Sequence, residues 1–278
     1  MNSVPGKVST RLAAGIKKFQ PILAVQQSRD VNEADTSVLV TEILCELFGY
    51  DKFTEITSEH EVHNAYCDKA VRVDGQIMLL VEVKAIGSEL KDAQVRQATD
   101  YAAKEGVDWV VLTNAASWRV YKMIFGKPVE FELVYEFKFA DLNPRSDQHL
   151  EQLSLLSRES WHKNKLDEYQ TKMQVLGKFS LAAVILSEPV LNVVRRTLRR
   201  VSPGLKVNIS QIAAALQSEV LKREVLEGEK ADAARKMLKK VAGKSHHRAS
   251  TAGGEPPSVH DRAPADAGES AHLDVPNS

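Results

Sequence analysis

The sequence predicts an α/β domain, in which helices flank a mixed sheet, followed by an all-helical region. Apolar residues at helical spacing predict two helices at the start of the chain, at residues 7–20 and 33–48, and Gly49 is expected to end the second. Strand-like runs follow at residues 53–62, 67–73, 77–85, 109–114, 118–124 and 129–137. The third and fourth runs are separated by a helical segment that Ser88 can cap and that extends to about residue 104.

A change of composition after Asn143-Pro144 marks the expected domain boundary. From residue 149 to residue 240 the pattern is helical, and Asn208 with Gln211 resembles a capping box. Beyond residue 245 the chain is rich in Gly, Pro, Ala and Ser, which predicts disorder. We therefore expect an α/β domain at 1–142, a helical domain at 145–244 and a disordered tail at 245–278. Continuous helices are expected at residues 166–186, 189–200, 210–226 and 229–241.

Composition restricts the class of protein. Lys plus Arg and Asp plus Glu both count 37, so nucleic-acid binding would depend on local basic patches. One such patch is Arg195-Arg196 with Arg199-Arg200, although runs of charge are more often solvated helix faces. The cysteines, Cys45 and Cys67, have no metal-binding spacing, and no apolar stretch approaches the roughly 20 residues of a membrane span. We expect a cytoplasmic protein that does not bind membranes.

Charged residues inside an apolar strand are the most informative feature. Asp68 is followed, fourteen residues later, by Glu82-Val83-Lys84, at the end of the apolar run from Ile77. Buried charges cost several kcal/mol each unless they are paired or bind a metal. Two carboxylates and a lysine are the groups that a magnesium-dependent phosphodiesterase needs. The alternative is an edge-strand charge pattern with Asp68 in a loop, and the surrounding apolar residues argue against it.

The hairpin at Asp74-Gly75 decides whether the acids share a face. With a strict two-residue loop, Asp68 and Glu82 would point to opposite sides of the sheet. A three-residue loop, or an equivalent bulge, would place Asp68 opposite Leu80 and diagonal to Glu82, on one face with Lys84. Because metal binding needs this arrangement, we expect the longer loop or a bulge.

These residues resemble a known family. Asp68 with Glu82-Val83-Lys84 is similar to the Asp…(Asp/Glu)-x-Lys signature of the restriction-endonuclease-like (PD-(D/E)xK) superfamily. The order of further segments more specifically resembles the N-terminal nuclease domain of type I restriction enzyme R subunits and its small stand-alone relatives. These segments, within about residues 30–125, are Asn32–Thr36, Gly49–Asp51, Cys67-Asp68, Val81–Ala85, Gln97-x3-Tyr101, Val111–Asn114 and Trp118–Tyr121.

The resemblance implies roles for individual residues. Asp68 and Glu82 would be metal ligands and Lys84 the catalytic lysine. An acid on an upstream helix usually completes such a site; Glu33 fits best, Glu42 is the competitor, and Glu33 at a helix start also suits the helix dipole. One departure is Cys67, where the superfamily name expects proline.

Gln97 and Tyr101 lie four residues apart and hence on one helix face. The pair resembles an extra motif that the R-subunit family places beside its nuclease centre. It would bind DNA or stabilise the active geometry. The alternative is a polar helix surface with Tyr101 half-buried.

The resemblance implies a Mg²⁺-dependent endonuclease, with Mn²⁺ as a substitute, that hydrolyses DNA in defence or repair. A catalytically inactive binding or regulatory scaffold is the first alternative, and RNA as the substrate is the second. DNA is the expected partner. The helical domain is a candidate for self-association, and a targeting protein is a further candidate partner.

Overall fold

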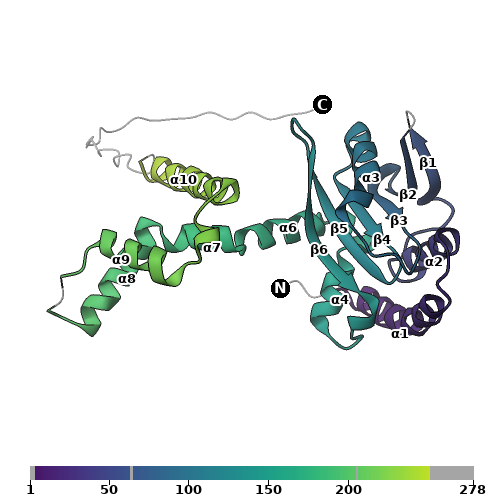
Figure 1. The fold of residues 1–278 in the computed structure, drawn as a ribbon, viewed down its shortest axis with the longest axis horizontal. Coiled ribbons are helices and arrows are strands. Elements are labelled where there is room, and N and C mark those ends of the chain that lie inside the picture. The colour runs from purple at the N-terminus through teal and green to yellow at the C-terminus, as the bar shows by residue number, and fades with distance from the viewer. Residues whose placement is uncertain (1–3, 63–64, 205, 251–278) are drawn as a thin grey trace, which may run out of the picture. The chain divides into compact units, whose positions relative to one another are not determined.

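The computed structural model describes residues 4–62, 65–204 and 206–250, and for residues 59–62, 65–66 and 241–250 only the backbone. In this part of the chain one sheet has the sequential order β1-β2-β3-β4-β5-β6 (Figure 1). Its strands are β1 (Ile56–Val62), β2 (Ala65–Val73), β3 (Gln76–Val83), β4 (Trp109–Thr113), β5 (Ser117–Ile124) and β6 (Glu130–Lys138). Only β3 and β4 are parallel, because helix α3 (Asp92–Glu105) connects them; the other neighbouring pairs are antiparallel. The mixed sheet flanked by helices is confirmed.

Two apolar cores cover the two faces of the sheet. Helices α1 (Gly6–Ser28) and α2 (Glu33–Glu46) pack on one face, where Leu79, Val81 and Val83 of β3 join their core. Helix α3 packs on the other face, together with Leu80 of β3. Strand β3 lies between β2 and β4, so its apolar sequence fits burial on both faces. Charges at the end of this strand therefore lie beside the core.

The β2–β3 hairpin has a two-residue loop, so the expected three-residue loop is wrong. Val73 pairs with Gln76, and both Asp74 and Gly75 have positive φ (53° and 82°), as a type I′ turn requires. A bulge at Met78 then shifts the register, since Arg72 pairs with Ile77 but Val71 pairs with Leu79. A bulge is thus present and brings the acids to one face, but its extra residue lies on β3, so it places Asp68 opposite Glu82 and not, as expected, opposite Leu80.

Helix α3 begins later than the sequence indicated. Its N-cap is Lys91, not Ser88, and the side chain of Gln94 accepts a hydrogen bond from the backbone N–H of Lys91 (2.7 Å). The backbone N–H of Ser88 donates to the carbonyl oxygen of Ala85 (2.9 Å), so residues 85–91 form a turn and loop after β3. Gly106, with φ 68°, ends the helix in the left-handed conformation.

Three short helices follow the sheet and belong to the first compact unit, which spans residues 1–177. They are α4 (Asp147–Ser154), α5 (Arg158–Trp161) and α6 (Lys165–Val175). Leu153 and Trp161 are buried in the same core as α1 and α2. The hydroxyl of Tyr50 donates to the carbonyl oxygen of Leu156 (2.7 Å). Residues 145–177, which we had assigned to the helical domain, thus pack within the first unit.

The second unit begins at Lys178 and is helical throughout its described part. It contains α7 (Lys178–Ile185), α8 (Glu188–Val201), α9 (Ile209–Ala215), a π-helical turn (Leu216–Val220), a 3₁₀ turn (Arg223–Val225) and α10 (Glu229–Ser250). The expected helix 166–186 is interrupted between Val175 and Lys178. The expected helix 210–226 is α-helical only to Ala215.

The capping box of Asn208 and Gln211 is confirmed. Residues 245–250, which we assigned to the disordered tail, form the end of α10. The rest of the predicted tail, from residue 251 on, lies outside the described residues. Among the described helices, none has the length and apolar character that spanning a membrane requires.

Candidate active site

The site is at the carboxyl end of β3, where this strand runs parallel to β4. Glu82 pairs with Leu112, and the backbone N–H of Lys84 donates to the carbonyl oxygen of Thr113 (2.8 Å). Next to this pair, the side chain of Asn114 donates to the carbonyl oxygens of Ile86 (3.2 Å) and Ser88 (2.9 Å). These bonds fix the loop that follows Lys84. We missed this role of Asn114; its place directly after a buried strand was the available signal.

Asp68 lies opposite Glu82. The register Lys69↔Val81, continued by one residue, brings the two acids into a direct pair and not the expected diagonal one. Directly opposed residues of an antiparallel pair point to the same face. The backbone N–H of Val83 donates to Asp68 Oδ2 (2.6 Å), so Asp68 also holds the end of β3.

Lys84 connects two carboxylates. Its Nζ lies 2.8 Å from Glu82 Oε1 and 3.6 Å from Glu33 Oε1. Glu33 is the first residue of α2, and the backbone N–H of Ile86 donates to the carbonyl oxygen of Val31 (3.4 Å), which joins the start of α2 to the loop after β3. The structure therefore brings Glu33 to the expected site.

Glu42 lies elsewhere on α2 and pairs with Lys52 (Oε1 to Nζ 2.8 Å). Of the two candidate upstream acids, only Glu33 contacts Lys84 in the described structure. Asn32 caps α2 by accepting a hydrogen bond from the N–H of Asp35 (2.9 Å). Glu33 is thus free of the capping task, although its favourable interaction with the helix dipole remains.

Burial and neighbouring charges determine the electrostatics. The side chain of Glu82 is only 5% exposed, and this burial raises the pKa of its carboxyl; the charges of Asp68 and Glu33 raise it further, against the effect of Lys84. Burial lowers the pKa of Lys84, but its hydrogen bond to Glu82 and the charges of Glu82, Glu33 and Asp68 outweigh this, so the net shift is upward. Lys84 is therefore a cation at neutral pH, among three acids.

The carboxylate oxygens of this site are the kind of ligand that a hard divalent cation prefers. Asp68 and Glu82 present carboxylates on one face, and the ammonium of Lys84 already occupies a position between two acids, as a cation would. Among the described residues, no group of three His, Cys, Asp or Glu side chains is arranged to hold a metal. Mg²⁺ does not require such a group, because it usually keeps several waters and is held by one or two carboxylates together with substrate phosphate.

Gln97 and Tyr101 differ in their surroundings. Gln97 is exposed, whereas Tyr101 is fully buried in the core between α3 and the sheet. Burial raises the pKa of the Tyr101 hydroxyl, and the charge of Glu105 adds to the effect. In this conformation Tyr101 supports the packing of α3, and contact of the pair with a substrate stays a prediction.

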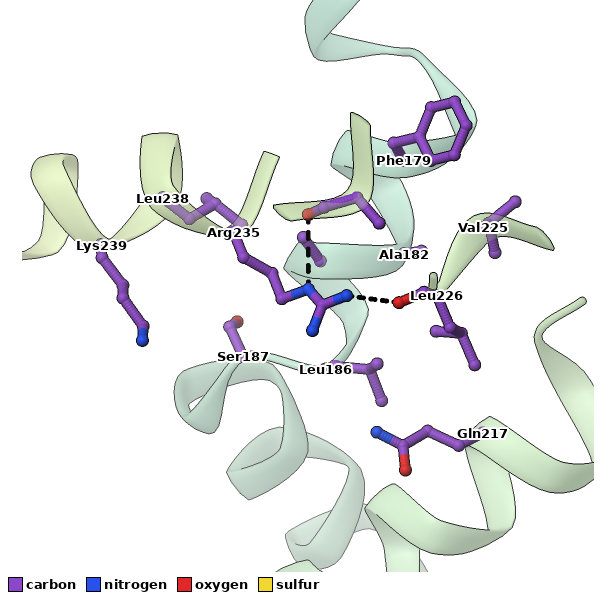
Figure 2. Close-up of a pocket in the computed structure, with 12 residues that line it drawn as sticks. Phe179, Ala182, Leu186, Ser187, Gln217, Val225, Leu226, Arg235, Leu238 and Lys239 are labelled. Atoms are coloured by element: carbon purple, nitrogen blue, oxygen red, sulfur yellow. Dashed lines mark hydrogen bonds between the residues drawn. The ribbon is translucent and has the colours of Figure 1, made fainter. Parts of the chain in front are cut away.

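A separate pocket lies within the helical unit (Figure 2). Its volume is about 350 Å³, and its walls include Phe179, Leu186 and Leu226. Arg235 crosses it and donates to the carbonyl oxygens of Ala231 (3.3 Å) and Leu226. Among its described lining residues there is no Asp, Glu, His or Cys, so they offer none of the carboxylate ligands found at the β3 site.

Comparison with known proteins identifies one family. Residues 35–137 match the family described as "Type I restriction enzyme R protein N terminus". The match includes Asp68, Glu82, Lys84, Gln97 and Tyr101, and begins after Glu33. It confirms the relationship that the motifs indicated. Searches of the curated proteins and of the solved structures gave no match.

Proposed function

We propose, since residues 35–137 are related to the N terminus of type I restriction enzyme R proteins, that this protein is a Mg²⁺-dependent endonuclease that hydrolyses DNA. One observation carries the proposal: the ammonium of Lys84 lies between Glu82, which is buried, and Glu33, which is exposed, with Asp68 opposite Glu82. Such a cluster is expensive to keep in a fold, because buried charges lose their hydration. The family match supports a restriction-type role, and a role in DNA repair is the alternative within the same proposal.

Each residue has a task in the proposed reaction. Asp68 and Glu82 would hold Mg²⁺, or Mn²⁺ in its place. The bound ion would lower the pKa of a water and offset charge on the phosphate. Lys84, which is charged at neutral pH, would orient the water or donate to a phosphate oxygen while the water oxygen attacks phosphorus and the P–O bond to the leaving oxygen breaks. Glu33 would hold the Lys84 ammonium in place.

Substitution of Lys84 tests the proposal. Purified protein is incubated with linear, circular and single-stranded DNA and with RNA, in Mg²⁺ or EDTA. The unmodified protein should cut DNA only in Mg²⁺, and Lys84→Ala should lower the rate by roughly 10²–10³-fold, the usual effect of losing a preorganised electrostatic group. Lys84→Gln should lose activity similarly while its amide still donates to Glu82, which separates chemistry from stability.

The matched control is Lys52→Ala, since Lys52 also pairs with a glutamate of α2 but lies outside the site. It should retain its activity. Unimpaired cleavage by both Lys84 variants would remove Lys84 from the mechanism. Preferential cleavage of RNA would change the substrate class.

A binding or regulatory scaffold is the second candidate function. The bond from Val83 N–H to Asp68 Oδ2 favours it, since one metal-ligand oxygen already has a structural task. Retained nucleic-acid binding, with no cleavage of any substrate in the panel, would support the scaffold.

A further inference from the structure

Charge is distributed very unevenly along this electrically neutral chain. Residues 178–250 contain 15 Lys and Arg but 6 Asp and Glu, a net charge of +9. Residues 1–177 contain 21 basic and 26 acidic residues, a net charge of −5. Charge asymmetry between parts of a chain indicates a polyanionic partner such as nucleic acid or a membrane surface. The equal overall counts conceal this asymmetry.

The basic charge of the helical unit is most concentrated on α8. Arg195, Arg196, Arg199 and Arg200 lie on this helix, whose acidic residue is Glu188 at its start. Residues four apart are neighbours on a helix surface, so Arg195 lies beside Arg199, and Arg196 beside Arg200. We call these four residues the arginine face. Three of them, Arg196, Arg199 and Arg200, are exposed.

The arginine face has no acidic counterpart in the described structure. Three other cations of the unit have one: Lys178 pairs with Glu224, Arg223 with Glu227, and Arg235 with Asp232. None of the four arginines forms an ion pair with a described residue. Like charges four residues apart destabilise a helix, and the dipole at the carboxyl end compensates only in the last turn. The dipole therefore accounts for Arg199 and Arg200 but not for Arg195 and Arg196.

The opposite side of α8 contacts the rest of the unit. Leu191 is buried, and Val190 and Val194 are half-buried, where α8 packs against α9 and α7. This packing leaves Arg196, Arg199 and Arg200 exposed, whereas Arg195 is half-buried and its Nε is buried with no hydrogen-bond partner among the described residues. The packing also buries part of the apolar side of α8 against other helices of the protein. An amphipathic membrane-binding helix, in contrast, inserts its apolar side into the lipid.

We propose that the arginine face of α8 binds the phosphodiester backbone of a nucleic acid and that the helical unit supplies affinity to the nuclease domain. The link to cleavage rests on the proposed function, whereas the binding itself does not. Arginine suits this task, because its planar guanidinium donates two parallel hydrogen bonds to phosphate and is weakly hydrated. Contacts to phosphate also carry no sequence information, so the expected binding is independent of sequence.

The test is fluorescence anisotropy with the full chain in EDTA, which prevents cleavage. The probes are duplex DNA, single-stranded DNA and duplex RNA, each over a range of NaCl concentrations. Changing all four arginines to glutamine should raise Kd at least tenfold near 0.1 M salt. The slope of log Kd against log salt should fall by about 3–4, since each phosphate contact on duplex DNA contributes roughly 0.9. Changing all four to lysine should preserve most of the affinity and of the slope.

A matched control removes four charges from exposed lysines of the first unit that form no described ion pair. The four substitutions are Lys17→Gln, Lys127→Gln, Lys138→Gln and Lys163→Gln. This variant should change the slope by less than about 1. Circular dichroism should show an unchanged helix content in all variants, because the arginine face makes no described ion pair that the fold would lose.

Three outcomes would overturn the proposal. The first is unchanged affinity and slope in the variant with four Arg→Gln substitutions, and the second is an equal loss in the control with four Lys→Gln substitutions. The third is that the Arg→Gln variant loses binding to phosphatidylserine vesicles but keeps its binding to nucleic acid. Failure of the nuclease proposal looks different. Tight, arginine-dependent binding without any cleavage would contradict the nuclease proposal but support nucleic-acid binding by the arginine face. Normal cleavage and binding by the glutamine variant would contradict the role of the arginine face but not the nuclease proposal. Comparison of the three probes identifies the nucleic acid.

Discussion

Arg11→Met should destabilise the first unit, because one guanidinium joins α1, the end of α2, and α5. Arg11 Nε donates to the carbonyl oxygen of Leu47 (3.0 Å), and its Nη2 donates to that of Phe48 (3.1 Å). Both terminal nitrogens also donate to the carboxylate of Glu159, at 2.7 Å each. Methionine would keep the apolar contacts of the side chain and remove these hydrogen bonds.

The expected loss is about 2–3 kcal/mol. The carbonyl oxygens of Leu47 and Phe48 follow a helix end, where acceptors need partners. Phe48 keeps a hydrogen bond from the backbone N–H of Arg158 (3.0 Å), so the two lost bonds together cost roughly 1.5–2 kcal/mol. The two-bond pair with Glu159 is partly exposed, with 28% and 42% of the two side chains accessible. After solvent screening it contributes about 0.5–1 kcal/mol.

Urea unfolding followed by tryptophan fluorescence measures this loss. Trp109, Trp118 and Trp161 are all the tryptophans of the chain, and all are buried in the first unit, so the signal reports that unit. The matched control is Lys18→Met on the same helix, whose exposed ion pair with Glu46 should contribute about 0–0.5 kcal/mol.

The pH dependence has a definite sign. The hydrogen bond from Arg11 lowers the pKa of Glu159, more than partial burial raises it. A lowered pKa stabilises the fold above the ordinary value of 4.5, and this contribution is lost as the pH falls through the lowered value. The difference between Arg11→Met and the unmodified protein should therefore shrink on acidification, leaving the part due to the two carbonyls. A difference below about 0.5 kcal/mol at neutral pH, or one that does not change with pH, would refute the reasoning.

Two further predictions concern α2. Glu33→Gln should slow cleavage by roughly tenfold, because it weakens the interaction that positions the Lys84 ammonium, whereas Glu42→Gln should have little effect. Measurement of kcat and KM for both variants tests this. A larger loss of activity in Glu42→Gln than in Glu33→Gln would contradict the proposed site. Gly49→Ala should cost at least about 2 kcal/mol in urea unfolding, since φ is +86° and the new Cβ would lie 2.6 Å from Arg11 Cζ. Combined with Arg11→Met, its cost should fall, and strict additivity would show that the clash is unimportant.

Local sequence patterns predicted most of the elements and the residue types of the proposed site. The sheet strands and the helices around them follow from periodicity and turn residues, because burial of one face and backbone preferences act within a few residues. Glu82 and Lys84 could be identified as site residues because they are charged and lie at the end of an apolar strand, which is also a local pattern. The late start of α3 was missed, since the side chain of Asn114 bonds the carbonyl oxygen of Ser88 and holds this residue in a loop. The helix break near Gly177 was also missed, although glycine is a local signal for a helix end.

What only the tertiary structure decided is which of these groups meet. The extra residue at Met78 sets the pairing of β2 with β3, and a shift of one residue determines on which face Asp68 and Glu82 lie. The choice of Glu33 over Glu42 depends on the contact between Val31 and Ile86, 55 residues apart in the sequence. Burial of Tyr101 depends likewise on how α3 packs on the sheet. The residue types of the site are thus written in the sequence, whereas their distances arise from pairing between distant segments, which no local pattern encodes.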